Sequence, residues 1–98
     1  MWIIESGAEN DRIVFRLPVG AVKTVGRAPR ADFVLDAALV SRLHCRLSAA
    51  ELGIEVVDLD STNGIFVNGK RVKQATLQAG DSLAIGRVVF TVSRAHQA

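Results

Sequence analysis

The stretch DSTNGIFVNGKR, residues 60–71, contains two Asn-Gly pairs. Asn-Gly is the strongest short signal for a tight turn, because both residues tolerate a positive φ. The second pair lies between two β-prone runs, residues 65–67 and 70–72, and therefore predicts a two-residue hairpin. The first pair instead ends the polar segment 58–62, which is predicted to be a loop. Polar loops on a rigid sheet commonly carry binding residues.

Short β-prone runs recur along the chain, with turn signals between them every eight to twelve residues. This spacing is typical of an all-β sandwich or barrel. Residues 36–47 have some helical features, but the β-branched Val40 and the lack of a stop signal argue against a helix. We therefore expect ten or eleven short strands, with β-prone runs at residues 2–4, 13–17, 22–25, 33–35, 45–49, 54–57, 65–67, 70–72, 82–85 and 88–92.

The composition limits the class of protein. A chain of 98 residues, of which 49% are hydrophobic, fits one folded domain, which we place at residues 1–93 with a polar tail at residues 94–98. No apolar run approaches the ~20 residues that span a bilayer, and no signal peptide is recognisable. The single cysteine, Cys45, excludes an internal disulfide. We expect a cytoplasmic protein, and the excess of arginine over lysine suggests a bacterial one.

Three polar loops carry the side chains with the clearest chemistry. Arg27 opens the first loop, Ser41 begins the second, and Thr62 lies in the third beside the first Asn-Gly pair. A phosphate monoester has a charge of about −1.5 to −2 and three acceptor oxygens. A guanidinium meets it with a planar, bidentate fork, and hydroxyls can donate to its remaining oxygens. The set therefore suits a phosphate group.

Four short motifs, taken together, resemble those of the forkhead-associated (FHA) domain. Each motif alone is a weak signal, but here all four occur in the order of the family on a strand-rich background, and the resemblance extends from Trp2 to about Ser93. The motifs are Gly26-Arg27, Ser41-Arg42-Leu43-His44, Ser61-Thr62-Asn63-Gly64 and Asn68-Gly69.

The resemblance implies an eleven-stranded β-sandwich of the FHA/SMAD-like type, with binding loops at one end. It implies a monomeric module that binds phosphothreonine peptides made by a Ser/Thr kinase, without a cofactor or metal. Arg27, Ser41 and Thr62 would contact the phosphate. Asn63 would hold the main chain of the peptide, and Arg42 would contact the phosphate or a peptide side chain. Structural support of the site is expected from Gly26, His44, Gly64, Asn68 and Gly69.

The resemblance leaves the sequence preference of the site open. In the family, specificity usually depends on a peptide residue about three positions after the phosphothreonine. Its reader lies in variable loop positions, here Leu39, Val40 and Arg42 or the stretch after Gly64.

The same residues do not match the motifs of an enzyme active site. Residues 64–70 fit the start of a nucleotide-binding P-loop, but Arg71 replaces the magnesium-binding hydroxyl and no helix is expected to follow. Ser41 and His44 lack an orienting acid and a nucleophile elbow. The histidines and the cysteine do not have zinc spacing. We expect no catalysis.

Two other binding functions stay open. The domain could bind partners through a face of the sandwich, independently of phosphate, as some FHA domains do. Nucleic-acid binding is suggested only by the net charge of +2, and the four Phe, one Trp and no Tyr offer no visible stacking platform. We therefore expect neither nucleic acid nor a membrane among the partners.

Overall fold

The computed structural model describes residues 1–7 and 11–95 and confirms the all-β fold. Within these residues no helix forms, including at residues 36–47, and no segment is a helix able to span a membrane. The eleven strands are β1 (Trp2–Ser6), β2 (Ile13–Leu17), β3 (Val22–Gly26), β4 (Phe33–Val34), β5 (Cys45–Ala49), β6 (Ile54–Asp58), β7 (Ile65–Val67), β8 (Lys70–Val72), β9 (Gln74–Leu77), β10 (Ser82–Ile85) and β11 (Val88–Arg94).

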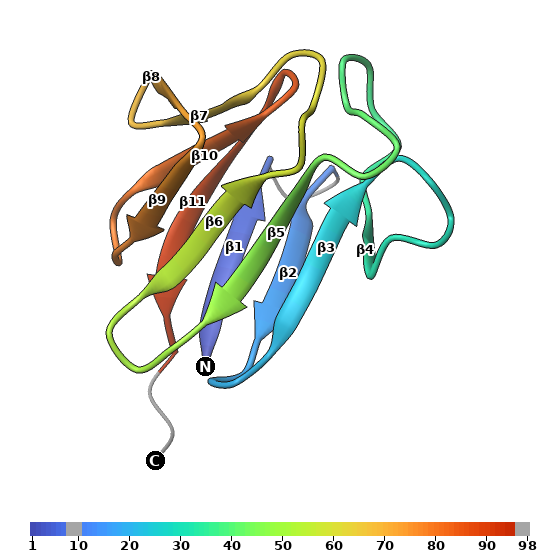
Figure 1. Cartoon of the computed structure of the whole chain (residues 1–98). Coiled ribbons are helices and arrows are strands. Elements are labelled where there is room, and N and C mark those ends of the chain that lie inside the picture. Colours follow the sequence, from blue (N-terminus) through green and yellow to red (C-terminus); the bar gives the residue numbers. More distant parts are fainter. Residues whose placement is uncertain (8–10, 96–98) are drawn as a thin grey trace.

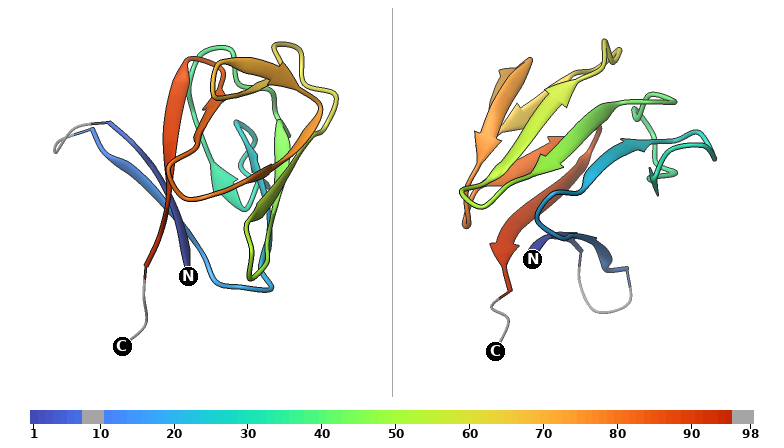
Figure 2. Two further views of the ribbon diagram at one scale, coloured as in Figure 1. Left: turned by 90° about the vertical axis from the view of Figure 1, so that its left-hand side faces the viewer. Right: turned by 60° about the horizontal axis from the view of Figure 1, so that its bottom comes forward.

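The strands form two sheets that pack as a sandwich (Figures 1 and 2). One sheet has six strands in the order β2-β1-β11-β10-β7-β8, and the other has five in the order β4-β3-β5-β6-β9. Neighbouring strands are antiparallel except β3 and β4, which pair in parallel. Because β1 pairs with β11, the two ends of the chain meet within the six-stranded sheet.

Alternating side chains fill the space between the sheets. Cys45, Leu47 and Ala49 on β5 point inward, as their spacing predicts, and so do Phe90 and Val92 on β11. Each fully buried large apolar side chain stabilises the fold by about 1.5–3 kcal/mol. This alternation holds both sheets in register, because a slip by one residue would expose the apolar face.

One strand was absent from the expected set. β9 lies where the sequence has only a short alternation, with Ala75 half-buried and Leu77 buried. It becomes a strand because β6 offers it a free edge, on which Ile54 pairs with Leu77. Pairing with a distant strand thus overrides a weak local signal.

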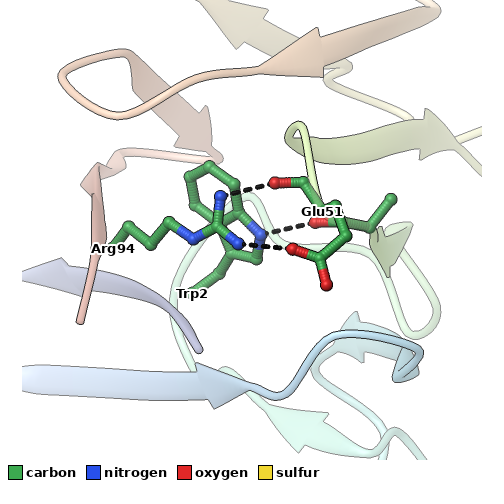
Figure 3. Close-up of polar contacts among 4 residues, drawn as sticks. Trp2, Glu51 and Arg94 are labelled. Carbon is green, nitrogen blue, oxygen red and sulfur yellow. Dashed lines mark hydrogen bonds and ion pairs between the residues drawn. The ribbon is translucent and has the colours of Figure 1, made fainter. Parts of the chain in front are cut away.

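Polar contacts join the start of β1 and the end of β11 to the turn between β5 and β6 (Figure 3). The Trp2 indole donates a hydrogen bond to the Ala50 carbonyl at 2.7 Å. Arg94 lies 4.8 Å from the centre of the Trp2 ring and forms an ion pair with Glu51 at 2.9 Å. β11 therefore extends to Arg94, one residue into the expected tail, whereas residues 96–98 of that tail lie outside the described residues.

Candidate functional site

Three loops meet at the end of the sandwich opposite the start of β1 and the end of β11 (Figure 1). They are the β3–β4 loop (residues 27–32), the β4–β5 loop (residues 35–44) and the β6–β7 loop (residues 59–64). β5 lies between β3 and β6 and is antiparallel to both. The end of β3, the start of β5 and the end of β6 therefore reach the same edge, which brings together loops that are distant in sequence.

The loops form an open groove with a volume of about 530 Å³. Its lining includes four predicted ligand contacts, Arg27, Ser41, Thr62 and Asn63, and also Leu39 and Val40, which the sequence analysis named for the sequence preference of the site. Residues 36–40 complete the wall, and Asp36 is the acidic member of the lining. The three predicted phosphate contacts thus share one groove.

Arg27 is positioned by an unusually close approach of two loops. Its amide and that of Ala28 donate to the carbonyls of Ser41 and Arg42, both at 3.0 Å. Gly26 permits this approach because a Cβ there would lie 2.1 Å from the Arg42 oxygen. The Arg27 Nε donates to the Val40 carbonyl at 3.1 Å. Among the described residues, neither terminal nitrogen of this guanidinium has a protein acceptor, so both can serve a ligand.

Ser41 connects the second loop to the third. The Thr62 amide donates to the Ser41 Oγ at 3.1 Å. Because the hydroxyl oxygen accepts this bond, its own hydrogen stays available for an acceptor in the groove. Thr62 is exposed beside it, so two residues with hydroxyl groups line the same groove as Arg27.

Asn63 braces the wall of the groove with its side-chain amide. Its Nδ2 donates to the Leu39 carbonyl at 3.0 Å. Leu39 has a φ of 70°, a left-handed conformation that is strained for a branched side chain. The Asn63 Oδ1 is left as an acceptor, suited to an N–H of a bound main chain.

His44 is fully buried and joins two of the three loops that form the groove, the β4–β5 and β6–β7 loops. Its Nδ1 accepts from the Ser41 amide at 3.0 Å, and its Nε2 lies 2.8 Å from the Gly64 carbonyl. An Nδ1 that accepts carries no proton, so the imidazole is neutral with its hydrogen on Nε2. His44 therefore positions both loops without reaching the groove.

Two residues that the sequence analysis gave no role hold the third loop in shape. The Ser61 hydroxyl donates to the Asp58 carboxylate at 2.5 Å and accepts from the Gly64 amide at 2.9 Å. Gly64 itself has a φ of 78°. A Ser three residues after an Asp at a strand end is a signal for such a local bond, but many loops contain it.

The other predicted residues lie away from the groove. Asn68 and Gly69 form the β7–β8 hairpin that the sequence predicts, with Val67 opposite Lys70. Arg42 lines a separate groove with residues 28–30 and Leu43. The structure therefore separates Arg42 from the three predicted phosphate contacts.

The surrounding titratable groups offer little chemistry. Burial, with a smaller contribution from the Asp58 charge, raises the pKa of the Cys45 thiol to about 12. This thiol is therefore protonated and unreactive at neutral pH. Among the described residues, no group of His, Cys, Asp and Glu side chains is arranged to hold a metal ion.

Comparison with known proteins gives one consistent family. An FHA domain model matches residues 23–86. The ABC transporter ATP-binding/permease protein Rv1747 of Mycobacterium tuberculosis is 44% identical over 77 residues, which cover 79% of this chain and 9% of that protein. The chain spans less than half the length of the curated relatives that it matches.

Two solved structures have the same fold over nearly the whole chain. The FHA domain of the CT664 protein from Chlamydia trachomatis has a TM-score of 0.88 at 29% identity, covering 97% of this chain and 98% of its own. A second structure, described as a structural and functional analysis of phosphothreonine-dependent FHA domain interactions, has a TM-score of 0.85 at 26% identity. The match covers 99% of this chain and 100% of that chain.

Proposed function

The chain belongs to the FHA domain family, and we propose that it binds proteins phosphorylated on threonine, through the groove between its three loops, without catalysing a reaction. The observation that carries this proposal is the convergence of Arg27, Ser41 and Thr62 on one groove. These residues come from three loops, and a guanidinium with two hydroxyls matches the charge and the acceptors of a phosphate monoester.

The protein's own hydrogen bonds leave the ligand-binding groups unused. The backbone holds Arg27 by its Nε, and the Ser41 hydroxyl is used only as an acceptor. A preformed set of donors loses little conformational entropy when the phosphate binds. Asn63 then holds the peptide main chain beside the phosphothreonine, and the apolar residues 37–40 offer a surface for the threonine methyl group and a neighbouring side chain.

The affinity should be moderate. One phosphate and a short extended peptide bury little surface, so we expect a micromolar Kd, about 8 kcal/mol of binding free energy. Most of it depends on the phosphate, because charge-assisted hydrogen bonds are the strong ones. Replacing Arg27 by Ala should therefore cost about 2–5 kcal/mol of binding free energy.

The test is a calorimetric titration with a phosphothreonine peptide library and its unphosphorylated counterparts, including phosphoserine versions. We expect binding of the phosphothreonine form alone, lost in Arg27→Ala and kept in Arg46→Ala, since Arg46 is an exposed residue of β5 outside the groove. Equal binding of phosphorylated and unphosphorylated peptides would refute the proposal. A natural partner that binds Arg27→Ala unchanged would indicate a phosphate-independent module instead.

The proposed setting follows from the same chemistry. The partner must first be modified by a Ser/Thr kinase, which places the domain in a signalling or assembly pathway. A reducing cytoplasm is supported by the buried, unpaired Cys45. The preformed groove belongs to a single copy of the chain, which supports a monomeric domain.

A further inference from the structure

A second groove lies beside the first and carries positive charge that the proposed phosphate site does not use. It has a volume of about 420 Å³ and is lined by Ala28, Pro29, Arg30, Arg42 and Leu43. Both arginines are exposed, and none of the lining residues is acidic. We propose that this groove is a second anion subsite, which binds an acidic side chain near the phosphothreonine of the same peptide. This inference rests on the proposed function.

The two grooves adjoin because consecutive residues line them. Arg27 and Ser41 face the first groove, whereas Ala28 and Arg42 face the second. Two amide-to-carbonyl hydrogen bonds, from Arg27 to Ser41 and from Ala28 to Arg42, join the residues that line the two grooves. An extended peptide advances about 3.3 Å per residue, so an acidic side chain within a few residues of the phosphothreonine can reach the second groove.

The two arginines are available to a ligand. The ion pairs among the described residues involve Arg12 and Arg94, not Arg30 or Arg42. Asp32 has the carboxylate nearest to Arg30 in sequence. This carboxylate already accepts hydrogen bonds from the Thr24 amide at 2.9 Å and the Thr24 hydroxyl at 3.2 Å. Two guanidinium groups without a local counter-ion favour an anion between them.

The backbone of this groove is held rigidly, and its floor is apolar. The Ala31 amide donates to the Ala28 carbonyl at 3.0 Å, which forms the turn that presents Arg30. Ala28 is buried, and Pro29 and Leu43 add apolar surface beside the charges. Apolar surface lowers the local dielectric, so charge pairs there are stronger than on a fully hydrated surface.

The first groove differs from the second in charge, because Asp36 adds a carboxylate to its lining. An acidic peptide residue beside Asp36 would meet a like charge. The site should therefore favour acid on one side of the phosphothreonine only, rather than around it generally.

The experiment is a scan of one aspartate, with asparagine as its neutral counterpart, through the positions flanking phosphothreonine in an otherwise alanine peptide. At one or two positions on one side, we expect aspartate to bind roughly three- to tenfold more tightly than asparagine in low salt. Phosphoserine at the same position should gain at least as much, because it also carries an anion, whereas a gain with phosphoserine and none with aspartate would assign the groove to a second phosphate and overturn the proposal.

The variant Arg30→Gln/Arg42→Gln should reduce the aspartate-to-asparagine affinity ratio to about one. The matched variant Arg16→Gln/Arg46→Gln removes the same two charges from exposed positions on β2 and β5 and should keep the ratio. An unchanged ratio in the first variant, equal loss in both variants, or no gain at any position would overturn the subsite.

These outcomes are distinguishable from failure of the proposed function. If the neutral phosphothreonine peptide does not bind the native protein, the proposed function fails and the subsite fails with it. If that peptide binds and the scan is flat, the subsite alone is wrong. Loss of oligonucleotide binding in Arg30→Gln/Arg42→Gln, with an unchanged peptide ratio, would assign the groove to nucleic acid and overturn the proposal.

Discussion

The two Asn-Gly pairs have the same sequence but act differently. In the β7–β8 turn, both Asn68 and Gly69 have a positive φ, at 50° and 83°, and the Asn68 side chain accepts from the Ser82 amide of neighbouring β10 at 2.9 Å. In the first pair, which ends the β6–β7 loop, only Gly64 has a positive φ, and the Asn63 side chain reaches back to the Leu39 carbonyl of the β4–β5 loop. The first pair braces a ligand groove, whereas the second shapes a hairpin.

The difference shows how the neighbours of a turn decide its role. The second pair lies directly between two paired strands, so the hairpin itself sets the turn, and the Asn68 side chain adds a bond to β10. The first pair follows a polar loop and depends on side chains from far along the chain. Variants of the two regions should therefore separate peptide binding from stability.

The largest effect on stability is expected for His44, a residue of another loop that holds the first pair in place. His44→Ala removes a buried ring and leaves the Ser41 amide and the Gly64 carbonyl without partners. We expect the free energy of unfolding to fall by about 2–4 kcal/mol, with peptide affinity reduced in the molecules that stay folded. Urea denaturation measures the first effect, and a change below measurement error would contradict the bracing role of His44.

Exchange of each asparagine for alanine should separate the two roles. Asn63→Ala should weaken phosphopeptide binding about tenfold, about 1.4 kcal/mol, with a smaller effect on unfolding. Asn68→Ala should lower the free energy of unfolding by about 1 kcal/mol and change affinity less than twofold. Parallel calorimetry and denaturation of both variants would check this, and the reverse pattern would show that the roles had been assigned the wrong way round.

The two glycines provide a smaller and more specific contrast. A positive φ costs alanine about 1–2 kcal/mol at either position. At Gly69 a Cβ meets nothing within 4 Å, whereas at Gly64 it lies 2.5 Å from the Arg71 Nε, which must move. Gly64→Ala should therefore destabilise the domain slightly more than Gly69→Ala and should alone reduce peptide affinity. Equal affinities in the two variants would contradict the proposed site.

The smallest effect is expected in acid and concerns the second pair. The Gln78 amide, and then the Asn68 side chain, hold the pKa of Asp81 below its usual 3.8. A carboxyl with a lowered folded pKa stabilises the protein above the unfolded value, and this contribution is lost as pH falls through the folded pKa. The native protein should thus lose more stability between about pH 5 and pH 2 than Asp81→Asn. Denaturation at stepped pH measures it, and parallel curves would contradict it.

The sequence by itself determined the features that depend on local backbone preference and residue chemistry. The Asn68-Gly69 hairpin follows from the tolerance of both residues for positive φ, and the inward faces of β5 and β11 follow from alternation. The types of side chain suited to a phosphate were also visible, because Arg27 and Thr62 each stand next to a turn signal and Ser41 begins a polar loop.

Only the tertiary structure decided which of these side chains meet. Arg27 and Ser41 share a groove while Arg42, adjacent to Ser41 in sequence, faces another. β9 is a strand because β6 leaves an edge beside it. These outcomes depend on hydrogen bonds between segments that are distant along the chain, and strand order and register set those bonds, whereas dihedral preferences belong to each residue alone.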